Sequence, residues 1–132
     1  MTVHVENEGV CNIAGFAGLE ELVRTYRHPR LRALPDIANA YLGSAPPSAA
    51  DLARLLPFTD ILHIKDYDNA ARRFVAIGEG DLPIEALLAA TLPGRDAPLT
   101  LTIETHAASE PAATTARSVN ALRRTVDRVA RG

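Results

Sequence analysis

The sequence contains one cysteine, no tryptophan and no long hydrophobic run. The single cysteine, Cys11, excludes an intrachain disulfide and a thiolate zinc site, and we expect it to be a small core residue rather than a nucleophile. No stretch approaches the roughly 18 apolar residues that would cross a membrane, and no basic start followed by an apolar stretch indicates a secretory signal. We therefore expect a globular protein in the cytoplasm that has no membrane partner.

Basic residues are also too scattered to form a nucleic-acid surface. The chain has 14 Lys and Arg against 16 Asp and Glu, for a formal net charge of -2. Without a concentrated basic stripe to meet a phosphate backbone, nucleic acid is excluded as an expected partner. Of the 14 basic residues 13 are arginine, so Lys65 is the only lysine. Either this position requires lysine itself, or one lysine persists in a sequence biased toward arginine, and both interpretations stay open.

Four short apolar runs, each followed by a turn-rich stretch and a helical pattern, indicate βα units with a parallel sheet. The runs cover residues 2–6, 31–36, 60–65 and 99–104. One βαβ crossover takes about 30 residues, whereas a complete eight-unit barrel takes about 250. The 132-residue chain therefore has the size of half a (βα)8 TIM barrel, an α/β fold of four βα units. Residues 1–132 are expected to form this single half-barrel domain.

Capping residues and apolar spacing place the helices between these runs. An apolar face over residues 16–26 predicts the first helix. Ser48 and Asp81 are predicted to cap the second and third helices, and an apolar face over residues 116–129 predicts the fourth. Pro35 falls inside the second apolar run, where it removes a hydrogen bond that an interior strand should make.

Each predicted strand ends in a potential metal ligand. The four residues are Glu6, Asp36, His63 and Glu104. Because the carboxyl ends of the strands in such a barrel meet at one face, these side chains should converge. Three converging carboxylates repel one another unless a cation or protons neutralise them. Three carboxylates with one imidazole suit a hard or borderline divalent ion such as Mn²⁺, Mg²⁺ or Co²⁺.

Taken one at a time, these residues have ordinary structural explanations. An aspartate after a strand is commonly a helix cap, and a lone histidine is more often a structural residue than a ligand. Four such residues at equivalent positions of four units favour a shared metal site over four independent explanations.

The same residues lie within motifs that resemble those of the xylose-isomerase-like TIM barrels, in the AP-endonuclease-2-like superfamily, which include sugar epimerases, sugar phosphate isomerases and inosose dehydratases. The resemblance spans nearly the whole chain. The matching segments are Val3-His4-Val5-Glu6-Asn7, Leu34-Pro35-Asp36-Ile37-Ala38-Asn39, Ile61-Leu62-His63-Ile64-Lys65-Asp66, Ile77-Gly78-Glu79-Gly80 and Leu101-Thr102-Ile103-Glu104. In that family these motifs belong to strands five to eight, so the resemblance implies the C-terminal half of the barrel. DNA repair nucleases of the superfamily use a trinuclear site with more histidines and a basic groove, and neither is visible in this sequence.

The resemblance also implies roles for individual residues. The four implied metal ligands are Glu6, Asp36, His63 and Glu104. The two glutamates, Glu6 and Glu104, would in addition act as an acid–base pair on opposite faces of the substrate. Asn39 would hydrogen-bond near the metal or the substrate, and Lys65 would lie close to an anionic group. Glu8 departs from the pattern, because many members have histidine there.

The expected function is that of a divalent-metal-dependent isomerase or epimerase acting on a small sugar or sugar phosphate. One glutamate would remove a proton next to the carbonyl, and the other would return it through an enediolate. The barrel's first half would have to come from a partner, either a second copy in a homodimer or a separate N-terminal half-barrel chain. Three alternatives stay open: a non-catalytic half-barrel remnant or interaction module, a dehydratase or lyase of the same family, and a Schiff base on Lys65.

Overall fold

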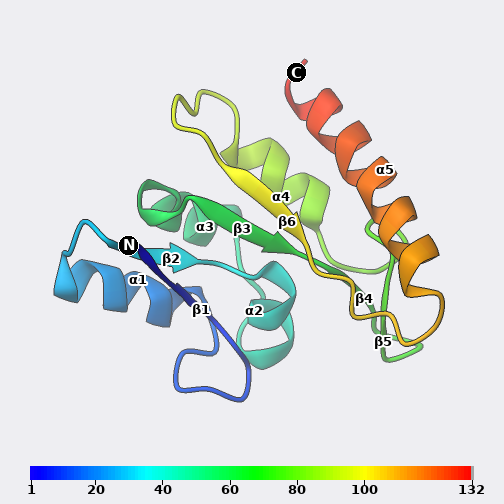
Figure 1. The fold of residues 1–132 in the computed structure, drawn as a ribbon, viewed down its shortest axis with the longest axis horizontal. Coiled ribbons are helices and arrows are strands. Elements are labelled where there is room, and N and C mark those ends of the chain that lie inside the picture. Colours follow the sequence, from blue (N-terminus) through cyan, green and yellow to red (C-terminus); the bar gives the residue numbers. More distant parts are fainter. Residues whose placement is uncertain (132) are drawn as a thin grey trace.

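A computed structural model describes residues 1–131 of the chain (Figure 1). Strands and helices alternate along most of the sequence, with one hairpin inserted after the third strand of the sheet. In chain order the elements are β1 (Val3–Glu6), α1 (Phe16–Tyr26), β2 (Leu31–Leu34), α2 (Ile37–Gly43), α3 (Ala49–Leu55), the 3-10 helix η1 (Leu56–Phe58), β3 (Ile61–Ile64), β4 (Asp66–Asp68), β5 (Arg73–Val75), α4 (Ile84–Thr91), β6 (Thr100–Ile103) and α5 (Pro111–Val129).

Four of the strands run parallel in the spatial order β1, β2, β3 and β6. β1 pairs with β2 from Val3↔Leu31 to Glu6↔Leu34, and β3 pairs with β6 from Ile61↔Thr100 to Ile64↔Ile103. Two isolated parallel bridges, Ala33↔Thr59 and Asp36↔His63, connect β2 to β3. The carboxyl ends of all four strands therefore meet at one edge, as expected for βα units.

Pro35 explains why isolated bridges, rather than a continuous ladder of hydrogen bonds, join β2 to β3. Its carbonyl accepts the N–H of His63 at 2.9 Å, so this residue faces β3. The N–H and C=O of one strand residue point toward the same neighbour, and proline has no N–H. The hydrogen bond that Pro35 cannot make is therefore missing on the β3 side, which agrees with the expectation from the sequence, and β2 ends at Leu34.

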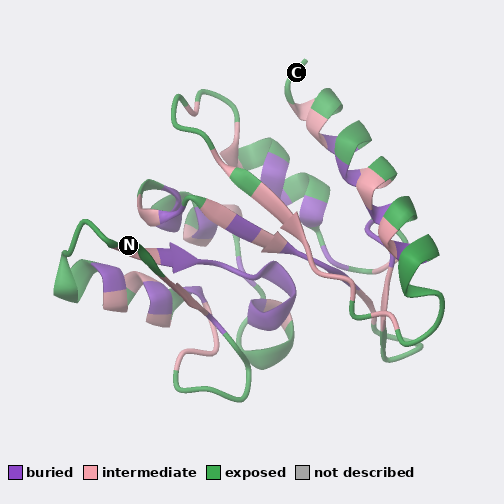
Figure 2. Ribbon diagram, viewed as in Figure 1, coloured by how far each residue is buried: buried purple, intermediate pink, exposed green. Residues whose placement is uncertain are grey.

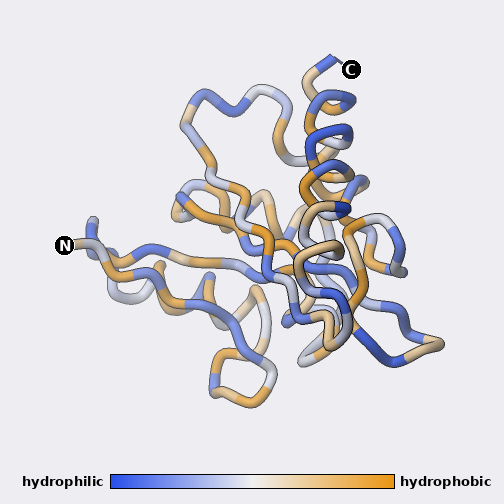
Figure 3. The backbone as a smooth tube through the Cα atoms, turned by 45° about the vertical axis from the view of Figure 1, so that its right-hand side comes forward, coloured by the Kyte–Doolittle hydropathy of each residue, from blue (hydrophilic) through white to orange (hydrophobic). Residues whose placement is uncertain are grey.

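Helices cover the outer face of the sheet and enclose the core. Figure 2 shows buried residues along β2, β3 and the helix turns that face them, with exposed residues in most loops. The largest fully buried aliphatic side chains include Leu19, Ile37, Leu52, Leu55, Leu62, Ile64 and Leu88. Burying one such side chain contributes about 1.5–3 kcal/mol, so this layer holds the helices against the strands. Blue and orange alternate along α5 in Figure 3, as expected for a helix with one apolar face.

Several local expectations were wrong. Cys11 is exposed rather than part of the core, because it lies in the loop between β1 and α1. Asp81 does not cap the third helix: Pro83 occupies the N-cap of α4, and the Asp81 carboxylate accepts the N–H of Asn69 instead. Ser48 does cap a helix, in a capping box with Asp51, yet the short helix α2 precedes it and was not predicted.

The two outer strands of the sheet each have one partner. Among residues 1–131, β1 pairs only with β2, and β6 pairs only with β3. Val3 on β1 is 48% exposed. In the same part of the chain, we find no helix with the length and apolar character needed to span a membrane.

Candidate metal centre

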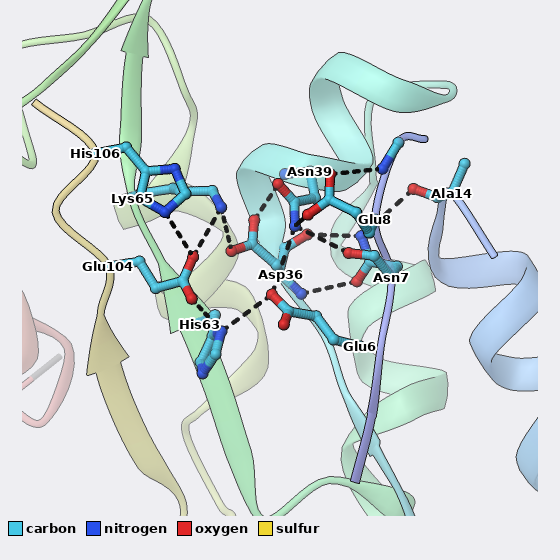
Figure 4. Close-up of polar contacts among 11 residues, drawn as sticks. Glu6, Asn7, Glu8, Ala14, Asp36, Asn39, His63, Lys65, Glu104 and His106 are labelled. Carbon is cyan, nitrogen blue, oxygen red and sulfur yellow. Dashed lines mark hydrogen bonds and ion pairs between the residues drawn. The ribbon is translucent and has the colours of Figure 1, made fainter. Parts of the chain in front are cut away.

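Four side chains converge where the parallel strands end (Figure 4). Glu6 is the last residue of β1, Asp36 caps α2 just after β2, His63 lies on β3, and Glu104 follows β6. One potential ligand atom from each lies within 4.8 Å of all the others. The sequence predicted that these four residues would come together, and the fold brings them together from four different strand ends.

His63 lies between two of the carboxylates. Its Nδ1 is 3.1 Å from Glu6 Oε1 and 3.2 Å from Glu104 Oε1. Glu6 ends the edge strand β1 and Glu104 directly follows the edge strand β6, so the imidazole on the inner strand β3 lies between them on the inner face of the sheet. The three side chains therefore surround a space in which one cation would contact all of them.

Asp36 is fully buried, and its two carboxylate oxygens have different surroundings. Oδ1 accepts the backbone N–H of Asn39 at 2.7 Å, which caps α2. Oδ2 lies 3.2 Å from Lys65 Nζ, but no donor in residues 1–131 meets this buried oxygen with hydrogen-bond geometry. Desolvation by burial raises the pKa of Asp36 above its ordinary value, although the Asn39 N–H and Lys65 oppose the shift.

A buried carboxylate oxygen without a hydrogen bond is the feature that a bound cation would satisfy. Buried polar atoms normally have a hydrogen-bond partner, and Asp36 Oδ2 has only its ion pair with Lys65 at 3.2 Å. Asp36 contributes one of the four ligand atoms that lie within 4.8 Å of one another. The donor set of three carboxylates and one imidazole also matches the ligand preferences of Mn²⁺, Mg²⁺ and Co²⁺, so the residues fit the metal that the sequence implied.

Lys65 is the positive charge inside this site. Its side chain is 2% exposed, and Nζ lies 2.8 Å from Glu104 Oε2 and 3.2 Å from Asp36 Oδ2. Burial alone would lower the pKa of Lys65, yet the hydrogen bond to Glu104 and the charge of Asp36 raise it overall. The ammonium group also lies 5.6 Å from the centre of the Phe74 ring. Its expected contact with an anionic substrate group stays a prediction.

Glu104 receives contacts from three nitrogen-bearing side chains. Oε1 faces His63, whereas Oε2 faces Lys65 at 2.8 Å and His106 Nε2 at 3.5 Å. Burial would raise the pKa of Glu104, but the hydrogen bond and charge of Lys65 and the neighbouring histidines lower it overall. Glu104 is therefore an ionised carboxylate at neutral pH, with one oxygen on the cluster side and one beside Lys65.

Asn39 links two strand-end loops on the other side of the site. Its Nδ2 donates to Asn7 O at 3.0 Å and to Glu8 Oε2 at 3.2 Å, and it lies 3.5 Å from Glu6 Oε1. The residue is nearly buried. In this structure Asn39 orients carboxylates near the cluster, and its expected contact with a substrate stays a prediction.

Three residues near the site received no individual role from the sequence. His106 follows Glu104 by two residues, so the alternation along the strand gave a signal that it would face the same way. Asn7 and Asp66 lie inside the motifs, but their contacts depend on the backbone of other segments. Asp66 is 1% exposed.

The Asp66 carboxylate orders the Gly-Glu-Gly loop beside the site. It accepts backbone N–H groups from Tyr67, Gly78, Gly80 and Leu82 at 2.8, 2.8, 3.1 and 3.2 Å. A Cβ on Gly80 would lie 2.6 Å from Tyr67 O, which explains glycine there. The N–H groups of this loop are thus occupied by a side chain of the protein itself, so the loop is not an open phosphate cradle.

The four-group cluster lies on the inner face of the sheet, where half a barrel has no opposite wall. A cavity of about 600 Å³ is found elsewhere, between the Gly-Glu-Gly loop and α5, and none of the four groups lines it. Ion pairs from Arg117 to Glu79 and from Arg128 to Glu85 connect its walls.

Three solved structures illustrate the similarity in fold. The probable 3-DHS dehydratase AsbF of Bacillus anthracis, involved in petrobactin synthesis, superposes with a TM-score of 0.74 at 17% identity, covering 93% of this chain and 49% of that one. For the 3-keto-D-glucoside 4-epimerase YcjR of E. coli, the TM-score is 0.73 at 19% identity, with coverages of 93% and 46%. A xylose isomerase-like TIM barrel protein of Mycobacterium smegmatis in complex with magnesium gives 0.68 at 15% identity, with coverages of 98% and 45%.

The comparisons also locate the chain within a family. It spans about half the length of the solved barrels, so the fold is half of a TIM barrel. No curated protein sequence matches it. The family model for the xylose isomerase-like TIM barrel matches residues 1–130. With this match over nearly the whole sequence, the chain belongs to the xylose isomerase-like TIM barrel family.

Proposed function

We propose that this chain is the metal-binding half of a divalent-metal-dependent isomerase or epimerase that acts on a small carbohydrate. The observation that carries the proposal is the convergence of four potential ligand atoms, one from each parallel strand end, within 4.8 Å of one another. Two similar structures add support through their descriptions, one as a 3-keto-D-glucoside 4-epimerase and one in complex with magnesium.

Four residues would hold the cation, and they are Glu6, Asp36, His63 and Glu104. Asp36 would contribute Oδ2, since Oδ1 is already engaged by the helix cap. Glu104 would contribute Oε1, the oxygen that faces His63, and would keep Oε2 beside Lys65. When bound, the cation would supply Lewis acidity toward the carbonyl and hydroxyl oxygens of the substrate.

The two glutamates would then move a proton. Glu104 is ionised at neutral pH because Lys65 and the neighbouring histidines lower its pKa against the effect of burial. It would take the proton from the carbon next to the carbonyl, while the electron pair of that C–H bond moves into the carbonyl group. Glu6 lies at the opposite edge of the sheet, across His63, and would return a proton to the other face or to the neighbouring carbon.

A dehydratase is the second candidate, favoured by the similarity to the probable 3-DHS dehydratase AsbF. Both reactions begin with the same proton abstraction next to a carbonyl. They differ in the second step, because a dehydratase expels a hydroxyl group instead of returning the proton to carbon. If the chain is a non-catalytic remnant, we expect neither the proton abstraction nor the step that follows it.

We also propose that a complementary half barrel completes the site. The free edges of β1 and β6 would accept neighbouring strands. A groove of about 350 Å³ beside β6 would receive apolar side chains of that half; its aliphatic lining is Leu101, Ile103, Val119, Leu122 and Val126.

Charge favours a different half over a second copy. Each chain places three carboxylates and one lysine on the inner face at the mouth of the barrel. Two copies would turn two such acidic clusters toward each other inside one barrel, and like charges at close range repel. We expect size-exclusion chromatography with light scattering to give a monomer for the purified chain. A stable homodimer would contradict the preference for a different half.

The first experiment is a calorimetric titration of the chain with Mn²⁺. Wild type should bind one ion, and Glu104→Gln should weaken binding about tenfold or more because a charged ligand becomes neutral. Glu21→Gln, an exposed carboxyl on α1, is the matched control and should bind like wild type. The metal proposal fails if wild type binds no Mn²⁺ or if Glu104→Gln matches Glu21→Gln.

Proton transfer is tested separately with D-fructose in D2O. Deuterium entering the position next to the carbonyl, followed by NMR in the presence of Mn²⁺ and lost in Glu104→Gln, supports the isomerase or epimerase. Loss of a hydroxyl group from the substrate would instead support the dehydratase. Metal binding with neither reaction would fit both the non-catalytic module and a half barrel that lacks its complementary half, and would not separate the two.

A further inference from the structure

Asn7 is a fully buried side chain that binds the backbone of Asp36 at two points. Its Oδ1 accepts the N–H of Asp36 at 2.8 Å, and its Nδ2 donates to the C=O of Asp36 at 3.1 Å. Nδ2 also lies 3.4 Å from Ala14 O in the following loop. Figure 4 shows the carboxamide beside the turn from which the Asp36 side chain reaches the cluster.

These contacts extend the pairing of β1 and β2 by one residue. The regular register ends at Glu6↔Leu34, and the next pair would be Asn7 opposite Pro35. Asp36 follows, with both backbone polar groups directed toward β1. The carboxamide of Asn7 donates through Nδ2 and accepts through Oδ1, and so takes the place of the strand backbone that Asp36 would otherwise need.

The remaining polar groups of Asp36 are also engaged, with one exception. Its C=O accepts a second hydrogen bond from Ala40 N–H at 3.1 Å, the first of α2. Oδ1 accepts the N–H of Asn39. Only Oδ2 lacks a hydrogen bond in residues 1–131, and it faces Lys65 and the cluster. The backbone position that Asn7 fixes therefore determines where this oxygen points.

We propose that Asn7 is the positioning residue of the metal centre, acting through the backbone of Asp36. The inference rests on the proposed function in one respect, because that function makes Asp36 Oδ2 a metal ligand. The contact between Asn7 and the Asp36 backbone is independent of it. Groups that orient a metal ligand typically change metal affinity about 10- to 100-fold when they are removed. Asn7 contacts no cluster atom directly, so its effect on metal affinity would be transmitted by Asp36.

The test compares Asn7→Ala with a variant that leaves the same kind of defect far from the site. Ser118 is 2% exposed and its hydroxyl accepts the N–H of Ile77 at 3.1 Å. Ser118→Ala therefore also removes the side-chain partner of a buried backbone N–H, between α5 and the Gly-Glu-Gly loop. Any general consequence of such a defect should appear in both variants.

Two measurements are made on each full-length variant. Calorimetry should give an Mn²⁺ affinity at least about tenfold weaker for Asn7→Ala, and within about threefold of wild type for Ser118→Ala. Hydrogen exchange of the metal-free chain should be at least about tenfold faster at the Asp36 amide in Asn7→Ala only. If Asn7→Ala does not fold, Asn7→Ser, whose shorter side chain lacks the two separate atoms that the carboxamide places against the N–H and C=O of Asp36, is measured in the same way and should show both effects.

The outcomes separate this inference from the metal proposal. Equal losses of affinity in the two variants, or wild-type affinity in Asn7→Ala, would overturn the positioning role. If wild type binds no Mn²⁺, the proposed function fails, and the exchange rate alone decides the backbone contact. An unchanged exchange rate at the Asp36 amide in Asn7→Ala would then overturn the proposed backbone contact.

Discussion

Lys65 Nζ lies 2.8 Å from Glu104 Oε2 and, at 3.2 Å, bridges from it to Asp36 Oδ2. The only lysine of the chain therefore pairs with two of the three carboxylates that converge at the strand ends, and its single charge offsets one of their three. This contact explains how the acidic cluster is accommodated before any cation binds.

Replacing Lys65 with methionine should destabilise the metal-free chain. The variant keeps the apolar stem but leaves two carboxylates without their counter-charge, and breaking a buried ion pair costs about 3–5 kcal/mol. Because Glu104 is partly exposed, about 2–3 kcal/mol is expected in the free energy of urea-induced unfolding. Saturating Mn²⁺ should recover part of the loss. A Lys65→Met chain as stable as wild type would contradict the role of Lys65 as counter-charge.

Lys65 should not form a Schiff base. A nucleophilic amine must be neutral, whereas Glu104 and Asp36 raise the pKa of Lys65 despite its burial. Incubation with dihydroxyacetone and borohydride, followed by digestion and mass spectrometry, should give no reduced adduct on the peptide that contains Lys65. The same adduct detected at the N-terminal amine would serve as the internal positive control, and an adduct at Lys65 would revive the lyase alternative.

The parts of the site that follow strand periodicity were predictable from the sequence, and those that depend on facing backbones were not. Glu6, Asp36 and Glu104 each end an apolar run and His63 lies near the end of another, so parallel topology was enough to predict that they would converge. Asn7 gave no such signal. Its role depends on the register that places it opposite Pro35 and beside the N–H and C=O of Asp36.

The sequence patterns did not indicate two elements of secondary structure, in one case because a single residue serves two elements and in the other because the strands are short. Asp36 follows β2 and also caps α2, a helix of seven residues that has no separate start signal. The hairpin β4–β5 has three residues in each strand and is rich in charge, so the sequence indicates only a turn-rich stretch there. Its turn contains Arg72 with a φ of 52°, a conformation that the sequence gave no reason to expect.

Gly80→Ala should destabilise the chain more than Gly94→Ala. A Cβ at position 80 would lie 2.6 Å from Tyr67 O and would also contact the Asp66 carboxylate, so the loop or the hairpin must move. At Gly94 no atom lies within 4 Å of the added Cβ, and only the φ of 75° opposes alanine. We expect losses of about 1–3 kcal/mol for Gly80→Ala and about 1 kcal/mol for Gly94→Ala, measured by urea unfolding. Equal losses would contradict the packing of this loop around Asp66.

The Arg32–Asp60 ion pair should make stability depend on pH at the opposite end of the strands. Arg32 donates to both oxygens of Asp60, at 2.9 and 2.6 Å, and this hydrogen bond, against the effect of partial burial, lowers the pKa of Asp60. A carboxyl whose pKa is lower in the folded chain contributes stability above its unfolded pKa, near 3.9, and loses that contribution as the pH falls through the folded pKa. Asp60 is 49% exposed, so solvent screening limits the contribution to about 0.5–1 kcal/mol.

Asp60→Asn should therefore be less stable than wild type at pH 7, and the gap should narrow as the pH is lowered from 5 toward 3. Urea unfolding at each pH measures the gap directly. In an Arg32→Gln background the same substitution should produce a smaller pH-dependent difference, because the main group that lowers the pKa of Asp60 has been removed and only the contact with His4 Nε2, at 3.4 Å, remains. A gap that is constant with pH, or one that persists unchanged without Arg32, would show that Asp60 contributes to stability by packing or hydrogen bonding rather than through its charge.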